Sequence, residues 1–109
     1  MTDDKLLELP ATAVAAGIAR GEFSSEDYTR ACLARIAAAE PIVHAFAHVD
    51  EEHALAQARE CDDWRRSGRP IGPLHGVPVA IKDIIDTADY PTDCGSPALS
   101  GRRPRQDAT

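Results

Sequence analysis

Lysine is rare in this sequence. Only Lys5 and Lys82 occur, beside ten arginines. Arginine keeps its charge at physiological pH, so a side-chain amine that has to give up its proton must be lysine. Lys82 follows the apolar run 77–81, and apolar surroundings disfavour an ammonium ion. A neutral amine can act as a general base, which makes Lys82 the main candidate for chemistry. The adjacent Asp83 would either oppose proton loss or orient the amine by a hydrogen bond. The competing interpretation is a solvated strand end.

Three helices are expected before this lysine. Residues 10–20 carry a helix-spaced apolar face, with Pro10 suited to the first turn and a glycine after the last. A second helix follows Ser24 as N-cap, with Asp27 three residues on as an imperfect capping box, and is expected to end at Pro41. A third helix is predicted over 51–66, with Asp50 as its cap.

Two segments are expected to be strands. Apolar residues alternate over 42–49, and 77–82 is an apolar run between loops. A short helical turn is predicted at 96–99, where Pro97 follows a serine. The resulting fold class is α/β, a mixed sheet flanked by helices. The sheet is incomplete in this chain, because two strands do not make a stable sheet.

Composition limits the classes of function. The net charge is −6, which argues against general nucleic-acid binding. The N-terminus lacks the basic-then-apolar pattern of a signal peptide, and no apolar run approaches the ~20 residues of a membrane span. Three widely spaced cysteines form no disulfide framework or CxxC motif, which favours reduced thiols in a cytoplasm. Abundant Ala and Arg without Asn suggest a GC-rich bacterial genome.

The histidines are weaker candidates. His44 and His48 are four residues apart and His53 follows, a spacing that would suit a metal only on a helix. Because a strand is expected there, surface histidines are the preferred interpretation and no metal site is predicted. His75 lies in the Pro/Gly-rich loop 69–76 and is expected to shape the approach to the lysine strand.

Cys94 and a basic loop are further candidates. Cys94 has no base near it in sequence, so a small buried thiol is expected. Arg102, Arg103 and Arg105 would be able to contact phosphate, although a solvated loop is the simpler interpretation. The glycines match no nucleotide-binding spacing, and no cofactor is predicted.

The second half of the sequence resembles the lysine segment of the amidase-signature family. The resemblance rests on GPLHGVPVAIKDIIDT at 72–87, CGSPAL at 94–99 and RQDAT at 105–109. An ordered match over about forty residues is far more specific than a short motif. A looser similarity extends over the N-terminal helices. The chain departs from the family pattern at Ile84, Asp89 and Tyr90, positions that would affect substrate choice rather than the lysine.

This resemblance implies a mechanism. In the family, a lysine at the position of Lys82 is the base of a Ser–cis-Ser–Lys triad, in which one serine bridges to the lysine and the other attacks the amide carbonyl. An acyl-enzyme forms, ammonia or an amine leaves, and water releases the acid. Both serines lie in a downstream Gly/Ser-rich segment that residues 1–109 do not contain. Ser96 and Ser100 do not match it. Lys82 is therefore the one catalytic residue assigned, and the 109-residue chain by itself is expected to be inactive.

The resemblance also implies a domain plan and leaves alternatives open. Residues 1–109 would be the N-terminal part of a single amidase domain, with 1–68 helical apart from one strand and 69–109 carrying the lysine strand and loops. The partner would be a small-molecule amide. One alternative is the subunit of an amidotransferase that acts on misacylated tRNA, the only case in which nucleic acid is expected. Another is an inactive interaction module. Homo-oligomerisation is left open, and no membrane association is expected.

Overall fold

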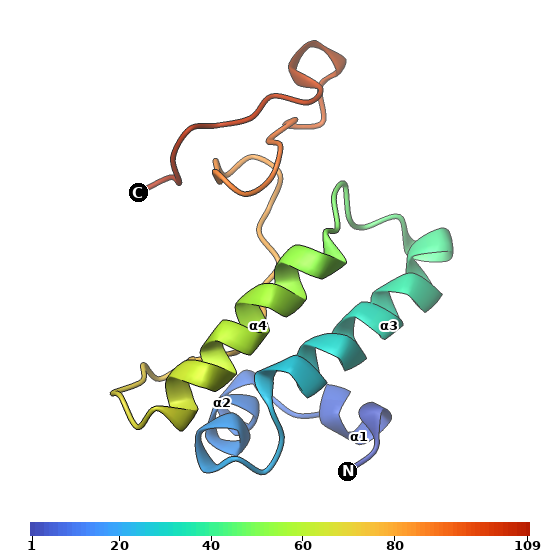
Figure 1. Cartoon of the computed structure of the whole chain (residues 1–109). Helices are drawn as coiled ribbons and strands as arrows, with labels where there is room; N and C mark the ends of the chain where they lie inside the picture. The colour runs from blue at the N-terminus through green and yellow to red at the C-terminus, as the bar shows by residue number, and fades with distance from the viewer. The chain divides into compact units, whose positions relative to one another are not determined.

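The computed structural model describes all of residues 1–109 and divides into two compact units. The first unit comprises residues 1–44 and 50–78, and the second comprises 45–49 and 79–109. The first holds four helices, α1 (Asp3–Leu7), α2 (Ala11–Arg20), α3 (Ser25–Val43) and α4 (Glu51–Arg66) (Figure 1). The second holds the 3₁₀-helix η1 (Pro97–Leu99). None of the helices combines the length and the apolar character needed to cross a membrane.

Capping residues set the helix boundaries as the sequence predicts. The Asp50 side chain accepts the N–H of His53 at 3.0 Å, and α4 runs over the expected residues. The capping box of α3 is complete: the Ser24 hydroxyl accepts the Asp27 N–H, and the Asp27 carboxylate accepts the Ser24 N–H. Helix α2 ends at Gly21, whose φ of 72° lies in the left-handed region that glycine tolerates.

Two helical features differ from expectation. Helix α3 does not end at Pro41 but continues to Val43, and the His44 N–H still donates to the Glu40 carbonyl at 2.9 Å. A proline within the last turn costs one backbone hydrogen bond, and a helix that is already ending loses little by it. Helix α1 was not expected from the sequence. It forms because Leu6, only 4% exposed, packs into the core.

The prediction of a mixed α/β sheet is wrong for this chain, which contains helices and no strand. Residues 42–43 belong to α3, and 45–49 are irregular. Residues 77–82 are also irregular, and Val79 and Ile81 are exposed. The physical reason is that a strand exists only through its ladder of hydrogen bonds to a neighbour. Within residues 1–109 neither apolar segment finds such a partner.

The core of the first unit is small and built from short side chains. Val14 and Ile18 of α2 are fully buried, as the apolar face predicted for residues 10–20 requires. Helices α3 and α4 lie side by side and run in opposite directions (Figure 1). Ala31 and Ala58 are buried on these two helices, 1% and 4% exposed. Small residues let two helices approach closely, although each buries little apolar area.

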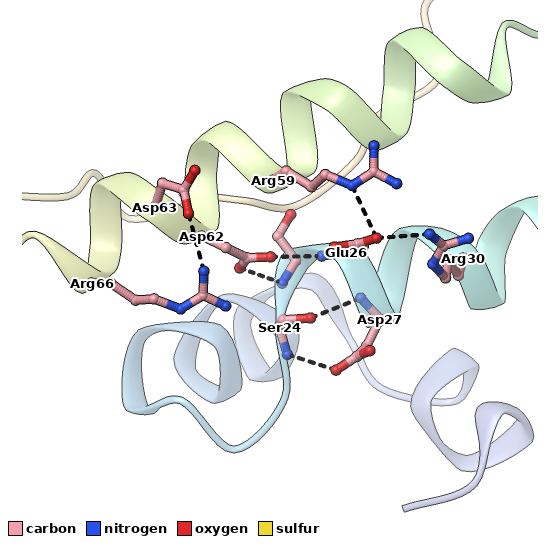
Figure 2. Close-up of polar contacts among 9 residues, drawn as sticks. Ser24, Glu26, Asp27, Arg30, Arg59, Asp62, Asp63 and Arg66 are labelled. Carbon is pink, nitrogen blue, oxygen red and sulfur yellow. Dashed lines mark hydrogen bonds and ion pairs between the residues drawn. The ribbon is translucent and has the colours of Figure 1, made fainter.

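A buried carboxylate joins α4 to the beginning of α3. Asp62 is 2% exposed, and its two oxygens accept the N–H groups of Ser25 at 2.8 Å and Glu26 at 3.0 Å (Figure 2). The first N–H groups of a helix have no partner within the helix, and this end carries partial positive charge. The anion of α4 therefore satisfies the N-terminus of α3, with two charge-assisted hydrogen bonds in place of water.

Surface ion pairs beside this contact add less. The Glu26 carboxylate accepts from Arg30 at 2.7 Å and from Arg59 of α4 at 3.1 Å (Figure 2). The hydrogen bond from Arg30 is the largest cause that lowers the pKa of Glu26. Exposed pairs of this kind are screened by solvent and contribute little to stability. The buried Asp62 contact is therefore the main polar link between α3 and α4.

The loop that precedes the lysine segment is fastened to the same helices. The Ser25 hydroxyl, on a residue that is 1% exposed, donates to the Gly76 carbonyl at 2.6 Å. His75 Nε2 lies 2.7 Å from the Cys61 carbonyl oxygen, which agrees with the structural role expected for His75. Gly76 has φ 80°, and a Cβ there would lie 3.1 Å from the Ser25 Cβ and 3.3 Å from the Ile18 Cγ2. This position requires glycine for both its conformation and its close packing.

Replacing the buried carboxylate should destabilise the helical unit. Asp62→Asn leaves one oxygen to accept and turns an NH₂ group towards the remaining backbone N–H. We expect a loss of about 1–3 kcal/mol in the free energy of unfolding, measured by urea denaturation followed by circular dichroism. Asp63→Asn is the matched control, because Asp63 forms only a surface pair with Arg66. Equal effects of the two substitutions would contradict the role assigned to Asp62.

Comparing Gly68 with Gly76 distinguishes the cost of a left-handed backbone from the cost of steric crowding. Gly68 and Gly76 have φ of 76° and 80°, but nothing lies within 4 Å of a Cβ built on Gly68. Gly68→Ala should therefore cost only the left-handed backbone penalty, about 1–2 kcal/mol. Gly76→Ala should cost more, because the new methyl group meets Ser25 and Ile18. Thermal unfolding of both variants measures the difference, and equal losses would show that Gly76 is not crowded.

Candidate active-site lysine segment

Lys82 lies in the second unit, in a turn rather than at the end of a strand. Its carbonyl oxygen accepts the N–H of Ile85 at 3.0 Å, which closes the turn that begins at the lysine. The Lys82 side chain is exposed, and so is Ile81 before it. The low-dielectric surroundings expected for the amine are thus not provided by residues 77–81 within this chain.

Asp83 forms hydrogen bonds that hold the backbone after the lysine. Its carboxylate accepts the N–H of Asp93 at 2.9 Å, and its carbonyl oxygen accepts the N–H of Cys94 at 2.9 Å. Of the two roles considered for Asp83 from the sequence, orienting the amine receives no support, because this carboxylate bonds a backbone N–H ten residues away. Asp83, the residue next to Lys82, instead holds the backbone at 93–94.

Asp93 connects three parts of the second unit. Its carboxylate accepts the N–H of Gly101 at 2.7 Å and contacts His48 Nε2 at 2.7 Å, while its own N–H donates to Asp83. The hydrogen bond to His48, followed by the one from Gly101, lowers the pKa of Asp93. Sequence reasoning missed this residue. The only available signal was the number of aspartates in the turn-rich segment 83–93.

Asp86 forms a second set of contacts that hold the segment after the lysine. Arg102 donates two hydrogen bonds to its carboxylate, at 2.8 and 3.1 Å, and the Asp86 carbonyl accepts the Ala108 N–H at 2.8 Å. The hydrogen bond from Arg102 lowers the pKa of Asp86. The carbonyl of Arg102 also accepts the N–H of Thr92, which is 1% exposed.

Two of the three arginines in the basic loop 102–105 therefore make contacts within the chain. Arg102 pairs with Asp86, and Arg103 reaches the Asp89 carbonyl at 3.3 Å. Arg105 is exposed. A guanidinium already engaged by a carboxylate is a poor phosphate ligand, so this loop gives no structural support for a phosphate site.

The histidine and cysteine candidates lie in different settings. His44 is the exposed, left-handed C-cap of α3, and His48 contacts Asp93 in the second unit. Cys94 is exposed, so the expectation of a buried thiol is wrong. Cys94 lies in a turn with φ of 55°, where its N–H donates to the Asp83 carbonyl. Burial raises the pKa of the Cys61 thiol, and the charge of Asp62 adds to this effect.

The Asp86–Arg102 pair should make the second unit sensitive to acid. Because the pKa of Asp86 is lowered in the folded chain, its stabilising contribution is present above the unfolded carboxyl pKa of about 3.9. It is lost as pH falls through the lower folded value. A ¹³C NMR titration of the carboxyl groups should find Asp86 titrating below the usual range. Arg102→Gln should return it to that range, whereas Arg103→Gln should not. An ordinary midpoint in the parent chain would contradict the pairing.

Comparison with known proteins confirms the resemblance seen in the sequence. The Amidase family matches residues 27–109. A glutamyl-tRNA(Gln) amidotransferase subunit from Salinispora arenicola is 50% identical over 109 residues, covering 100% of this chain and 22% of that protein. The chain thus spans about a fifth of the length of the curated relatives it matches.

Solved structures of amide-cleaving enzymes share the fold of this region. Native peptide amidase from Stenotrophomonas maltophilia superposes with a TM-score of 0.85 at 41% identity, covering 93% of this chain and 21% of that enzyme. Fatty acid amide hydrolase gives a TM-score of 0.88 at 28% identity, covering 98% of this chain and 19% of the other. Since the family match includes Lys82 and most of the sequence, this chain belongs to the Amidase family.

Proposed function

We propose that this chain supplies the general-base lysine, Lys82, of an enzyme that acts on a carboxylic amide bond. The observation that carries the proposal is the position of Lys82 inside the family match, in the segment GPLHGVPVAIKDIIDT. The turn that fixes its backbone is compatible with this role. The chemistry uses no metal and no cofactor.

In the proposed reaction, one proton is taken from the attacking serine and is later returned to it. Neutral Lys82 accepts a proton, through a bridging serine, from the serine that attacks the amide carbonyl. The new C–O bond gives an acyl-serine, and the C–N bond breaks as the leaving ammonia or amine takes up a proton. Water then cleaves the ester, the acid leaves and the serine regains its proton. Lysine here takes the place that histidine has in other activated-serine enzymes.

Residues 1–109 do not carry this reaction alone in the proposal. They would form the N-terminal part of one larger amidase domain, whose other residues supply both serines and the acyl pocket. Coverage of about a fifth of the curated relatives supports this view. The same residues would also cover Val79 and Ile81 and bury the amine, which is the condition under which lysine becomes a base.

A second candidate function follows from the names of the relatives. The curated relatives that match are described as subunits of glutamyl-tRNA(Gln) amidotransferase. In that case the same lysine would serve an enzyme that transfers ammonia to an acyl group on tRNA, working with other subunits. Co-purification of a second polypeptide, together with glutamine-dependent amidation of Glu-tRNA, would identify it. Hydrolysis of a small amide without any partner would identify the hydrolase.

Sequencing the gene beyond the codon for Thr109 tests the hydrolase and the amidotransferase proposals together. We expect an open frame that encodes a Gly/Ser-rich segment with the two serines. In that polypeptide, Lys82→Arg should lower kcat for amide turnover by about 10²- to 10⁴-fold, because arginine cannot release its proton at neutral pH. Lys5→Arg is the control and should have no effect. A stop codon directly after Thr109, with no activity, would overturn the enzyme proposal and favour an interaction module.

A further inference from the structure

A line of polar contacts leads from a distant segment to the residue beside the lysine. His48 Nε2 lies 2.7 Å from one oxygen of Asp93, and the other oxygen accepts the Gly101 N–H at 2.7 Å. The Asp93 N–H donates to the Asp83 carboxylate at 2.9 Å. All of these residues belong to the second unit, and 45 positions separate His48 from Asp93 in sequence. The segment 45–49 is thereby tied to the loop that carries Lys82.

We propose that His48 and Asp93 are positioning residues for Lys82, and that they act through Asp83. This inference rests on the proposed role of Lys82 as the base. Neither His48 nor Asp93 is assigned any contact with substrate. Their role is to fix the backbone from which the amine extends.

The contacts hold the chain that directly follows the lysine. The turn from the Lys82 carbonyl to the Ile85 N–H sets the direction of this chain. Beside the lysine, Asp83 is held at two points, by Asp93 through its carboxylate and by Cys94 through its carbonyl oxygen. A lysine side chain has four flexible carbons, so its amine can be placed reproducibly only if its own Cα is held first. A displacement of about 1 Å in a reacting group can cost about 10²-fold in rate.

His48 has a defined part in this arrangement. A carboxylate held by one hydrogen bond is free to rotate, whereas Asp93 is held at both oxygens. Its side chain is only 19% exposed, which limits competition from water. With its carboxylate fixed, Asp93 presents its N–H to Asp83 in one orientation. Removing the imidazole frees one oxygen of Asp93 and loosens this orientation without touching Lys82 directly.

Because the chain has only two lysines, the surroundings of the Lys82 amine can be measured directly by NMR. Reductive methylation with ¹³C-formaldehyde labels the Lys5 and Lys82 amines together with the N-terminus, and NMR can follow the two lysine signals separately in the 109-residue chain. In the parent chain, the dimethyl signal of Lys82 should differ from its position in urea. His48→Ala should move it at least halfway to the urea position, while the Lys5 signal stays unchanged. His48→Gln, which can still donate to Asp93, should restore it.

Two further variants distinguish positioning from general destabilisation. Asp93→Ala removes the carboxylate that contacts His48 and Gly101, so it should move the Lys82 signal at least as far as His48→Ala does. The double variant should match Asp93→Ala, because both changes break the same pair. His44→Asn is the control, since His44 is exposed and asparagine tolerates its left-handed backbone. Circular dichroism of the helices checks that the first unit stays folded.

Clear outcomes would overturn the proposal. A parent Lys82 signal identical to that in urea would mean that the contacts do not position the lysine. A Lys82 signal unmoved by His48→Ala and Asp93→Ala, or additive shifts in the double variant, would also overturn it. None of these measurements requires turnover. A Lys82 that is positioned but not catalytic would therefore refute the proposed function and leave only the positioning by His48 and Asp93 established.

Discussion

The carboxylate of Asp62 at the N-terminus of α3 is the contact on which the helical unit depends. An anion that is 2% exposed is costly unless its hydrogen bonds are made, and here two backbone N–H groups that need acceptors make them. One of these belongs to Ser25, whose hydroxyl in turn holds the Gly76 carbonyl. A single buried charge thus links α4, α3 and the loop that continues towards Lys82.

The second unit uses the same chemistry without a hydrophobic core. Its turns are held by aspartates that accept backbone N–H groups: Asp83 from Asp93, Asp93 from Gly101, and Asp107 from Ala88 at 2.8 Å. Short carboxylates suit this role because they reach neighbouring backbone in turns. Such contacts define the path of a loop precisely enough for a functional residue, although solvent-exposed hydrogen bonds add little net stability.

Much of the exposed apolar surface lies in the segments that were expected to be strands. Val79 is 74% exposed and Ile81 54%. Side chains of this kind are normally buried in a folded protein. Here they stay exposed because no strand forms within residues 1–109, so no neighbouring strand pairs with these segments. The turns that follow need no neighbouring strand, because aspartates within this chain accept their backbone N–H groups.

The sequence by itself determined the local features. Capping residues such as Ser24 and Asp50 predicted where helices begin, and the ordered segment from residue 72 onward was sufficient to recognise the family. Local signals succeed here because each depends on residues a few positions apart. Tertiary structure alone decided that Leu6 is buried and α1 forms, that no strand pairs, and that Asp62 and Asp93 join distant segments. Those outcomes depend on which groups find partners far away in the chain, and no spacing within the sequence specifies that.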